Sequence, residues 1–280
     1  MDFMYNLCPM EATPHLETFV MPEAGEDAPP ARRLLRVLEE MMETAGRHAE
    51  IIGVGVQDLH ARGLTWVLAR LHVQIGSLPA AGAEARIATW PSGRHRLFAV
   101  REFQLKTPAG GEFLRATSAW ALMNLETRRP ARLDPHLPVF SRHPGRMIED
   151  GFSPLPPPHP GSARTWHRAE PGDIDINDHV NNTVYLDWAL RSAPETAGSL
   201  APSSLEASFL AEARLYDRVA CLTEIGRAAA LDAGHAAPRR RGRGGESVVL
   251  LQSLQEPVAG RELTRLRTCW ETASKLKNTI

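Results

Sequence analysis

The sequence has few cysteines, and this shortage excludes two kinds of architecture. Only three cysteines occur among 280 residues, at Cys8, Cys221 and Cys269, and none belongs to a CxxC pair. The odd number and the wide spacing argue against a disulfide framework and against a zinc site. A metal centre built on cysteine thiolates is therefore not expected.

The sequence also lacks an excess of charge and any long apolar run. Its 32 Lys and Arg residues nearly balance 33 Asp and Glu residues, for a formal net charge of −1. Such a chain creates no overall field that would attract nucleic acid or an anionic membrane. No apolar stretch approaches the length of a bilayer span, and the first residues show no basic segment followed by an apolar one. We expect a cytoplasmic protein that binds neither nucleic acid nor membrane.

The first half of the chain has the pattern of one long helix followed by strands. Apolar residues recur at helical spacing over residues 31–52, at Leu34, Leu35, Leu38, Met41, Met42, Ala45, Ala49 and Ile52. Residues 64–76 then alternate with a period of two, and strand-like segments follow at 84–90, 96–107 and 112–126. The breaks are "PSG" and "PAGG", the second of which favours a hairpin turn. This order predicts an α+β domain in which an antiparallel sheet wraps a helix.

A proline-rich stretch divides the chain, and the second half repeats the order of the first. Periodicity fails from Pro135 to Ala163, which indicates an extended linker. We expect domains at residues 1–140 and 164–280, joined by a linker at 141–163. The second half offers a strand, a polar stretch, a helix ending before Pro194 and further strands. The Arg/Gly-rich segment 229–245 is interpreted as a hairpin loop, with nucleic-acid contact as the alternative.

The polar stretch "GDIDINDHVNNTVYLDWAL", from Gly172 to Leu190, allows three interpretations. A calcium loop that begins at Asp173 requires Gly at its sixth position and Glu at its twelfth. This chain has Asp178 and Val184 there, so a cation loop is excluded. A helix cap requires one residue only, Asn181 or Asn182, at a helix that begins near Thr183. The other polar side chains fit either a solvated loop or a catalytic centre.

The catalytic interpretation rests on alternation. Asp175, Asn177 and His179 would point to one side of an extended backbone, where a His with a carboxylate and an amide can orient water or carry a proton. The start of the following helix offers free N–H groups that polarise a carbonyl oxygen. The apolar residues between them would line a dry pocket for an apolar substrate: Ile174, Ile176, Val180 and Val184.

The same stretch resembles the signature of the acyl-acyl-carrier-protein thioesterases, which release free fatty acids. The family pattern D-x-D-x-N-x-H-V-N-N-x-x-Y-x-x-W is matched at Asp173, Asp175, Asn177, His179, Val180, Asn181, Asn182, Tyr185 and Trp188. "GLTWVLARLHVQI", "ATWPSG", "RLFAVREFQL" and "ATSAWALMNLETRRPARL" are similar to segments of the family's first domain. The similarity covers residues 15–140 and 164–225, in order and in both halves.

The resemblance implies a tandem of two hotdog domains, each a long helix wrapped by an antiparallel sheet, and a thioester hydrolase without a cofactor. It implies catalytic roles for Asp175, Asn177 and His179, and for Glu212 in a strand after the helix. Where plant members often carry Cys, this chain has Ala213, and Cys221 lies eight residues beyond it. We therefore expect attack by an activated water, with an oxyanion region at Asn181, Asn182 and Thr183.

The resemblance also implies where the substrate binds. The acyl chain is expected in the first domain, with candidate pocket residues Met41, Met42, Trp66, Leu68 and Trp90. An acyl carrier protein is the expected partner, and the candidate contacts are Arg32, Arg33, Arg36, Arg94, His95 and Arg96. A homodimer is a further expectation. The alternatives are an acyl-CoA thioesterase and an acyl-binding protein without catalysis, because one fold supports several functions.

Overall fold

An amphipathic helix forms where the apolar spacing predicts it. Helix α1 spans Pro30–Ile51, and Leu34, Leu38, Met41 and Ala45 on one face are buried in the main hydrophobic core.

The structure is a computed structural model that describes residues 10–11, 13–21, 30–134, 136–138, 140–142, 144–197, 200–226 and 247–272. The Arg/Gly-rich segment 229–245 lies outside these residues. None of the described helices has the length and apolar character that crossing a bilayer requires.

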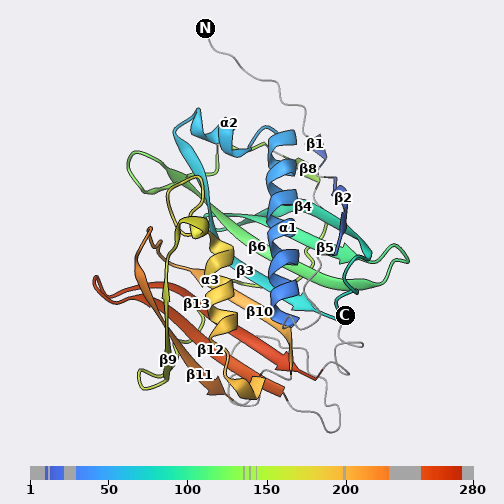
Figure 1. Cartoon of the computed structure of the whole chain (residues 1–280). Coiled ribbons are helices and arrows are strands. Elements are labelled where there is room, and N and C mark those ends of the chain that lie inside the picture. Colours follow the sequence, from blue (N-terminus) through green and yellow to red (C-terminus); the bar gives the residue numbers. More distant parts are fainter. Residues whose placement is uncertain are drawn as a thin grey trace.

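Within the residues that the structure describes, eleven strands form one sheet that the two halves of the chain share, ten in a continuous order and one short strand paired beside it (Figure 1). The first half contributes β2 (His15–Val20), β3 (Leu64–Ile75), β4 (Glu84–His95), β5 (Phe98–Lys106) and β6 (Glu112–Asn124). The second contributes β9 (Ala163–Arg168), β10 (Ala201–Phe209), β11 (Arg218–Gly226), β12 (Ser247–Glu256) and β13 (Arg261–Glu271). The order is β2-β4-β5-β6-β3-β10-β13-β12-β11-β9. The short strands β1 (Met10–Glu11) and β8 (Phe140–Arg142) pair with each other, and β7 (Pro130–Ala131) pairs with β6.

The two halves meet where β3 pairs with β10 in antiparallel register, with Leu71 opposite Ala207. Each half places a helix against its part of the sheet. In the second half this is α3, Asn182–Arg191, with 10 residues against the 22 of α1. A further short helix, α2 (Val56–His60), follows α1, and 3₁₀ turns occur at Pro171–Asp173 (η1) and Glu195–Ala197 (η2). The predicted α+β tandem, a helix wrapped by an antiparallel sheet in each half, is confirmed.

The two predicted breaks in the first sheet have different outcomes. The "PAGG" turn is confirmed, since Thr107 accepts from Gly110 N–H at 2.8 Å and donates to Gly111 at 2.9 Å. The prediction that "PSG" interrupts a strand is wrong, because β4 continues through it to His95. A register shift between Pro91 and Gly93 absorbs the proline, which cannot donate to the ladder.

The proline-rich connection is tied to both halves of the sheet. Met147 N–H donates to the buried carboxylate of Glu102 at 3.0 Å, and His72 Nδ1 lies 2.8 Å from Asp150 Oδ2. On the side of the second half, Arg265 donates to the carbonyl of Leu155 at 2.6 Å. These bonds hold residues 147–155 of the connection against the sheet, so this part of it is packed into the fold.

Candidate functional site

The polar stretch forms a tight loop in front of α3. Asp175 N–H donates to the His179 carbonyl at 2.8 Å, and Asp178 N–H donates to the Asp175 carbonyl at 3.1 Å. Asp178 has a φ of 61°, which is the left-handed region. The predicted extended backbone is therefore wrong. The Asp175 carboxylate causes the bend, because its Oδ1 accepts from Asn177 N–H at 2.8 Å, as in an Asx turn.

The loop brings His179 to Glu212. His179 is 6% exposed, and its Nε2 lies 3.1 Å from Glu212 Oε2. The same nitrogen lies 3.4 Å from Nη2 of Arg128. Within the part of the chain that the structure describes, His179 Nδ1 is buried and has no hydrogen-bond partner. Because the carboxylate requires a donor, we assign the proton to Nε2, which leaves the Nδ1 lone pair free.

Glu212 lies in the connection between β10 and β11, not in a strand as predicted. Regular pairing with β13 ends at Phe209, the N–H groups of Leu210 and Ala211 still donate to the Leu263 carbonyl, and the chain then turns toward the polar loop. There Val180 N–H donates to the Ala213 carbonyl at 3.0 Å, and Ala213 N–H donates to the Tyr185 hydroxyl at 2.7 Å. These bonds replace the strand ladder, and they fix Glu212 against His179.

The Tyr185 hydroxyl is expected to stabilise the fold through this bond. Tyr185 is fully buried, and burial raises the pKa of its phenol. In the variant Tyr185→Phe the Ala213 N–H keeps its buried position and loses its acceptor, which costs about 1–3 kcal/mol. Denaturant unfolding should show this loss. Tyr216→Phe is the control, because Tyr216 is 54% exposed and its removal should change the unfolding free energy by under about 0.5 kcal/mol.

The helix N-terminus behind the loop offers one free donor. Asn181 is the N-cap, and its Oδ1 accepts from Thr183 N–H at 3.0 Å. Its carbonyl accepts from Val184 N–H at 3.0 Å. Asn182 N–H donates to no atom within the described ranges. Of the two residues predicted to cap the helix, Asn181 is therefore the one that does so, and the N–H of Asn182 remains available to a ligand.

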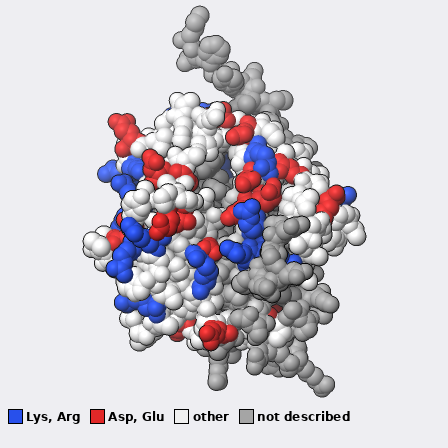
Figure 2. Space-filling model, viewed as in Figure 1, with Lys and Arg blue, Asp and Glu red and all other residues white. Residues whose placement is uncertain are grey.

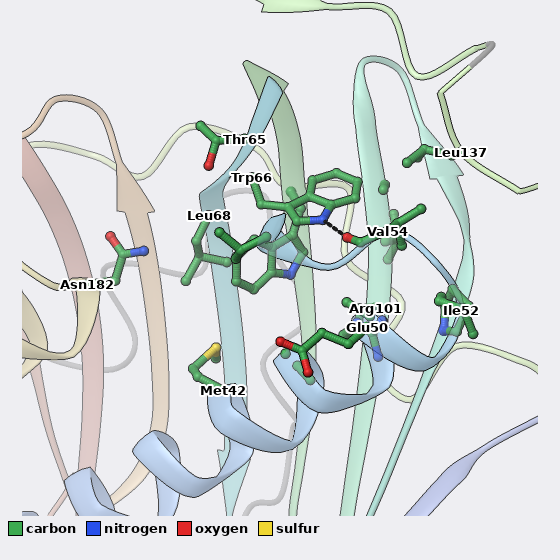
Figure 3. A pocket seen from close by; sticks show the side chains of 18 of the residues that line it. Met42, Glu50, Ile52, Val54, Thr65, Trp66, Leu68, Arg101, Leu137 and Asn182 are labelled. Atoms are coloured by element: carbon green, nitrogen blue, oxygen red, sulfur yellow. Dashed lines mark hydrogen bonds between the residues drawn. The ribbon is translucent and has the colours of Figure 1, made fainter. Parts of the chain in front are cut away.

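A cavity of about 730 Å³ runs between α1, the first-half sheet and the polar loop. Asp175, Asn177, Asn181 and Asn182 belong to its lining, together with Ile176. Figure 3 shows Met42 and Glu50 on the helix side, Trp66 and Leu68 on the sheet side, and Asn182 at one margin. The site residues of the second half thus border a largely apolar cavity in the first half.

The predicted pocket residues divide into two groups. Met42, Trp66 and Leu68 line the cavity. Met41 and Trp90 do not: Met41 packs in the main core, and the buried Trp90 donates its indole N–H to the Gly145 carbonyl at 3.1 Å. The prediction that the apolar residues of the loop line the pocket is also mostly wrong, because Ile174, Val180 and Val184 pack into the core behind α3. Helical and strand periodicity identifies a buried face but does not separate the core from a cavity.

One lining residue, Arg101, was not foreseen. Its guanidinium donates to His48 Nδ1 at 3.0 Å and to Thr89 Oγ1 at 3.1 Å. Burial lowers the pKa of Arg101 to about 10, and burial followed by the charge of Arg101 lowers that of His48 to about 4. At neutral pH Arg101 is therefore charged and His48 neutral. Nothing in the strand pattern of residues 96–107 distinguishes this arginine from a surface one.

Arg128 was also missed. It belongs to the turn after β6, where Asn124 Oδ1 accepts from the N–H groups of Glu126 and Thr127. Its φ of 56° places it in the left-handed region, and its guanidinium reaches His179 of the other half. A first-half turn therefore reaches the His179 and Glu212 pair of the second half.

The arginines predicted to contact a carrier protein are mostly engaged within the chain. Arg36 pairs with Glu39 at 2.6 Å and Arg94 with Asp134 at 2.6 Å, while Arg33 donates to the Pro79 carbonyl at 3.2 Å. Arg32 and Arg96 are exposed, and His95 is half-buried. Figure 2 shows basic and acidic side chains interspersed over α1, so this face presents no field of one sign.

A buried cysteine and a cluster of three titratable residues lie outside the cavity lining. Cys221 is buried and burial raises the pKa of its thiol, which argues against a thiolate nucleophile there. His72, Asp150 and Glu206 have donor atoms within 4.8 Å of one another and could hold a cation. Glu206, however, already binds the guanidinium of Arg267 at 2.6 Å, so this cluster acts as an ion-pair network between the halves.

Both halves of the chain match one family. The sequence profile of the acyl-ACP thioesterase N-terminal domain matches residues 16–138, and that of the C-terminal domain matches residues 164–272. A palmitoyl-acyl carrier protein thioesterase of Cuphea hookeriana is 28% identical over 87% of this chain and 59% of its own length. An oleoyl-acyl carrier protein thioesterase of Coriandrum sativum is 29% identical over 84% of this chain and 70% of its own.

Solved structures share the fold. The 12:0-ACP thioesterase from Umbellularia californica superposes with a TM-score of 0.74 at 24% identity, covering 92% of this chain and 93% of that one. An acyl-ACP thioesterase from Bacteroides thetaiotaomicron gives 0.73 at 21% identity, covering 92% and 98%. The chain thus spans nearly all of these structures, but 59% of the Cuphea hookeriana relative.

Proposed function

Since the chain belongs to the acyl-ACP thioesterase family, we propose that it hydrolyses the thioester of fatty acyl-acyl-carrier-protein and releases the free fatty acid. The observation that carries this proposal is the cavity. It joins an apolar interior in the first half to a carboxylate, an amide and a helix N-terminus of the second half. An acyl carrier protein is the partner that this reaction requires. The homodimer and the cytoplasmic location stay predictions.

The acyl chain would occupy the apolar part of the cavity. Met42, Trp66 and Leu68 offer hydrocarbon and aromatic surface there, and removing an acyl chain from water contributes about 0.8 kcal/mol per buried CH₂. The Trp66 indole N–H already donates to the Val54 carbonyl at 2.9 Å (Figure 3). Its ring can therefore meet a chain without leaving a buried donor unpaired.

The thioester carbonyl would lie at the start of α3. The Asn182 N–H is free and lies at the positive end of the helix dipole. Hydrogen-bond donors of this kind stabilise the oxyanion that forms when water attacks the carbonyl. Loss of one such donor typically costs about 2.7–4 kcal/mol.

Of the two candidate bases, the cavity favours Asp175. Its carboxylate borders the cavity, whereas Glu212 does not. One oxygen of Asp175 holds the loop, through Asn177 N–H. The carboxylate would take the proton of the attacking water, and the Asn177 amide would orient that water. His179, oriented by Glu212, would take this proton from Asp175 at its free Nδ1 and pass it to the leaving thiolate, which restores the Asp175 carboxylate and the neutral imidazole.

A panel of thioesters tests the function. The protein should release thiol from fatty acyl-acyl-carrier-protein with a kcat/KM at least about tenfold above that for the matched acyl-CoA. Faster turnover of the CoA esters would favour the acyl-CoA thioesterase instead. If no thioester is hydrolysed while a fatty acid still binds, the chain is an acyl-binding protein without catalysis.

Gly46 allows the position of the acyl chain to be tested. It lies on α1, borders the cavity, and a Cβ atom added there would meet nothing within 4 Å. Gly46→Phe should fill the cavity and lower kcat/KM for the longest acyl chains about tenfold or more relative to the shortest. Gly46→Ala is the control: it should keep the chain-length profile and gain about 0.5–1 kcal/mol of stability. An unchanged profile in Gly46→Phe would place the acyl chain elsewhere.

A further inference from the structure

The outer edge of the second half carries an exposed cluster of arginine and aromatic side chains. We call Arg164, Trp166, Arg168, Tyr216 and Arg218 the Arg–aromatic patch. Trp166 is 48% exposed and Tyr216 is 54% exposed, and the three arginines are exposed as well. The first three residues alternate along β9, so they share one face of a strand that ends the sheet (Figure 1).

The arginines of the patch stack on its aromatic rings. The guanidinium of Arg218 lies 4.8 Å from the centre of the Trp166 ring, and that of Arg168 lies 5.0 Å from the Tyr216 ring. None of the three patch arginines pairs with a carboxylate within the described ranges, in contrast to Arg36 and Arg94. A ring orders a guanidinium but does not neutralise it. The patch therefore keeps its positive charge.

Protection of a sheet edge explains only part of this composition. Charged side chains on an edge strand prevent pairing with other chains, which accounts for Arg164 and Arg168. It does not account for a half-exposed Trp166 beside a half-exposed Tyr216. Trp, Tyr and Arg are the residue types that dominate the binding energy of protein interfaces, and all three occur together here.

The patch adjoins both segments that carry the proposed catalytic residues. Tyr216 N–H donates to the Ala169 carbonyl at 3.0 Å, and Ala169 N–H donates to the Asp217 carbonyl at 3.0 Å. These bonds join the end of β9 to the connection that contains Glu212. From Ala169 the chain continues through η1 into the polar loop. A protein bound at the patch would lie beside the site.

We propose that the Arg–aromatic patch is the docking surface for the acidic carrier protein, a proposal that rests on the proposed function. Three unneutralised arginines require an acidic partner, and charge complementarity mainly raises the association rate. The aromatic rings supply the contact area that holds the complex. A second copy of this chain fits less well, because pairing two β9 edges would bring arginines against arginines.

The test compares a protein-bound substrate with a carrier-free one. In the triple variant Arg164→Glu, Arg168→Glu, Arg218→Glu, the KM for acyl-acyl-carrier-protein should rise at least about tenfold. Hydrolysis of the matched acyl-pantetheine should stay within about twofold of wild type. Added salt should raise the wild-type KM for the protein substrate, and the triple variant should lose this dependence. Trp166→Ala should raise the same KM without changing its salt dependence.

A charge reversal of the two α1 arginines, Arg32→Glu with Arg36→Glu, is the control and should leave the KM near wild type. The proposal fails if this control raises the KM and the patch variant does not. It also fails if a folded patch variant loses both substrates equally, or if Trp166→Ala dissociates a dimer with the KM unchanged. If the wild type hydrolyses acyl-pantetheine or acyl-CoA but not acyl-acyl-carrier-protein, the proposed function itself is wrong.

Discussion

Replacing Asp175 by asparagine is expected to lower kcat about 100- to 10,000-fold, the range that a general base typically contributes. The substitution is nearly isosteric, and the asparagine carbonyl oxygen can still accept from Asn177 N–H, the bond that closes the loop. The loop geometry should therefore survive while the base is lost. Stopped-flow or steady-state release of thiol from acyl-acyl-carrier-protein measures the effect, and thermal unfolding verifies that the fold is intact.

Asp178 provides the matched control. It belongs to the same loop, is exposed, and has a φ of 61° that asparagine tolerates well. Asp178→Asn makes the same chemical change and should keep kcat within about twofold of wild type. Equal losses in the two variants would mean that the charge of the whole loop matters. Near wild-type activity of Asp175→Asn would transfer the base role to Glu212.

The second large effect concerns His179 and Glu212 as a unit. Each of the variants His179→Gln and Glu212→Gln should lower kcat about 100-fold or more, because the carboxylate orients the ring that exchanges the proton. The contact of 3.1 Å between Nε2 and Oε2 makes the two side chains interdependent. The kcat of the double variant should therefore be only slightly below that of the less active single variant, as for other groups that act together.

Glu170→Gln is the control for this pair, since Glu170 is an exposed carboxylate just before η1 and the polar loop. It should leave kcat unchanged. Strictly additive losses in the double variant would contradict the pairing and would assign independent roles to His179 and Glu212. A kcat that survives His179→Gln would reduce the histidine to a structural part of the loop.

Helix α1 and the "PAGG" turn could be predicted because the sequence signals that specify them are local. The apolar stripe of α1 and the glycines at "PAGG" act within a few residues of the structure that they specify. The loop at Asp175 shows the limit of this reasoning. Alternation of polar and apolar residues indicates an extended backbone, but a short side chain that bonds its own backbone outweighs it.

The cavity could not be predicted, because its walls come from distant parts of the chain. Met41 and Met42 are neighbours on α1, yet one packs in the core and the other lines the cavity. Glu212 was identified by resemblance, but its place outside a strand depends on Tyr185 and Val180, which follow the loop. Arg128 reaches His179 only because β3 and β10 join the two halves.

That junction between β3 and β10 has a consequence for symmetry. Two identical hotdog subunits related by a twofold axis must present every residue twice, so any change in one pocket is copied into the other. A covalent tandem is free of this constraint. One half of this chain can keep a 22-residue helix over an open interior, while the other keeps a 10-residue helix behind a polar loop. The proposed division of labour, with the acyl chain bound in one half and the reacting groups in the other, would follow from that freedom.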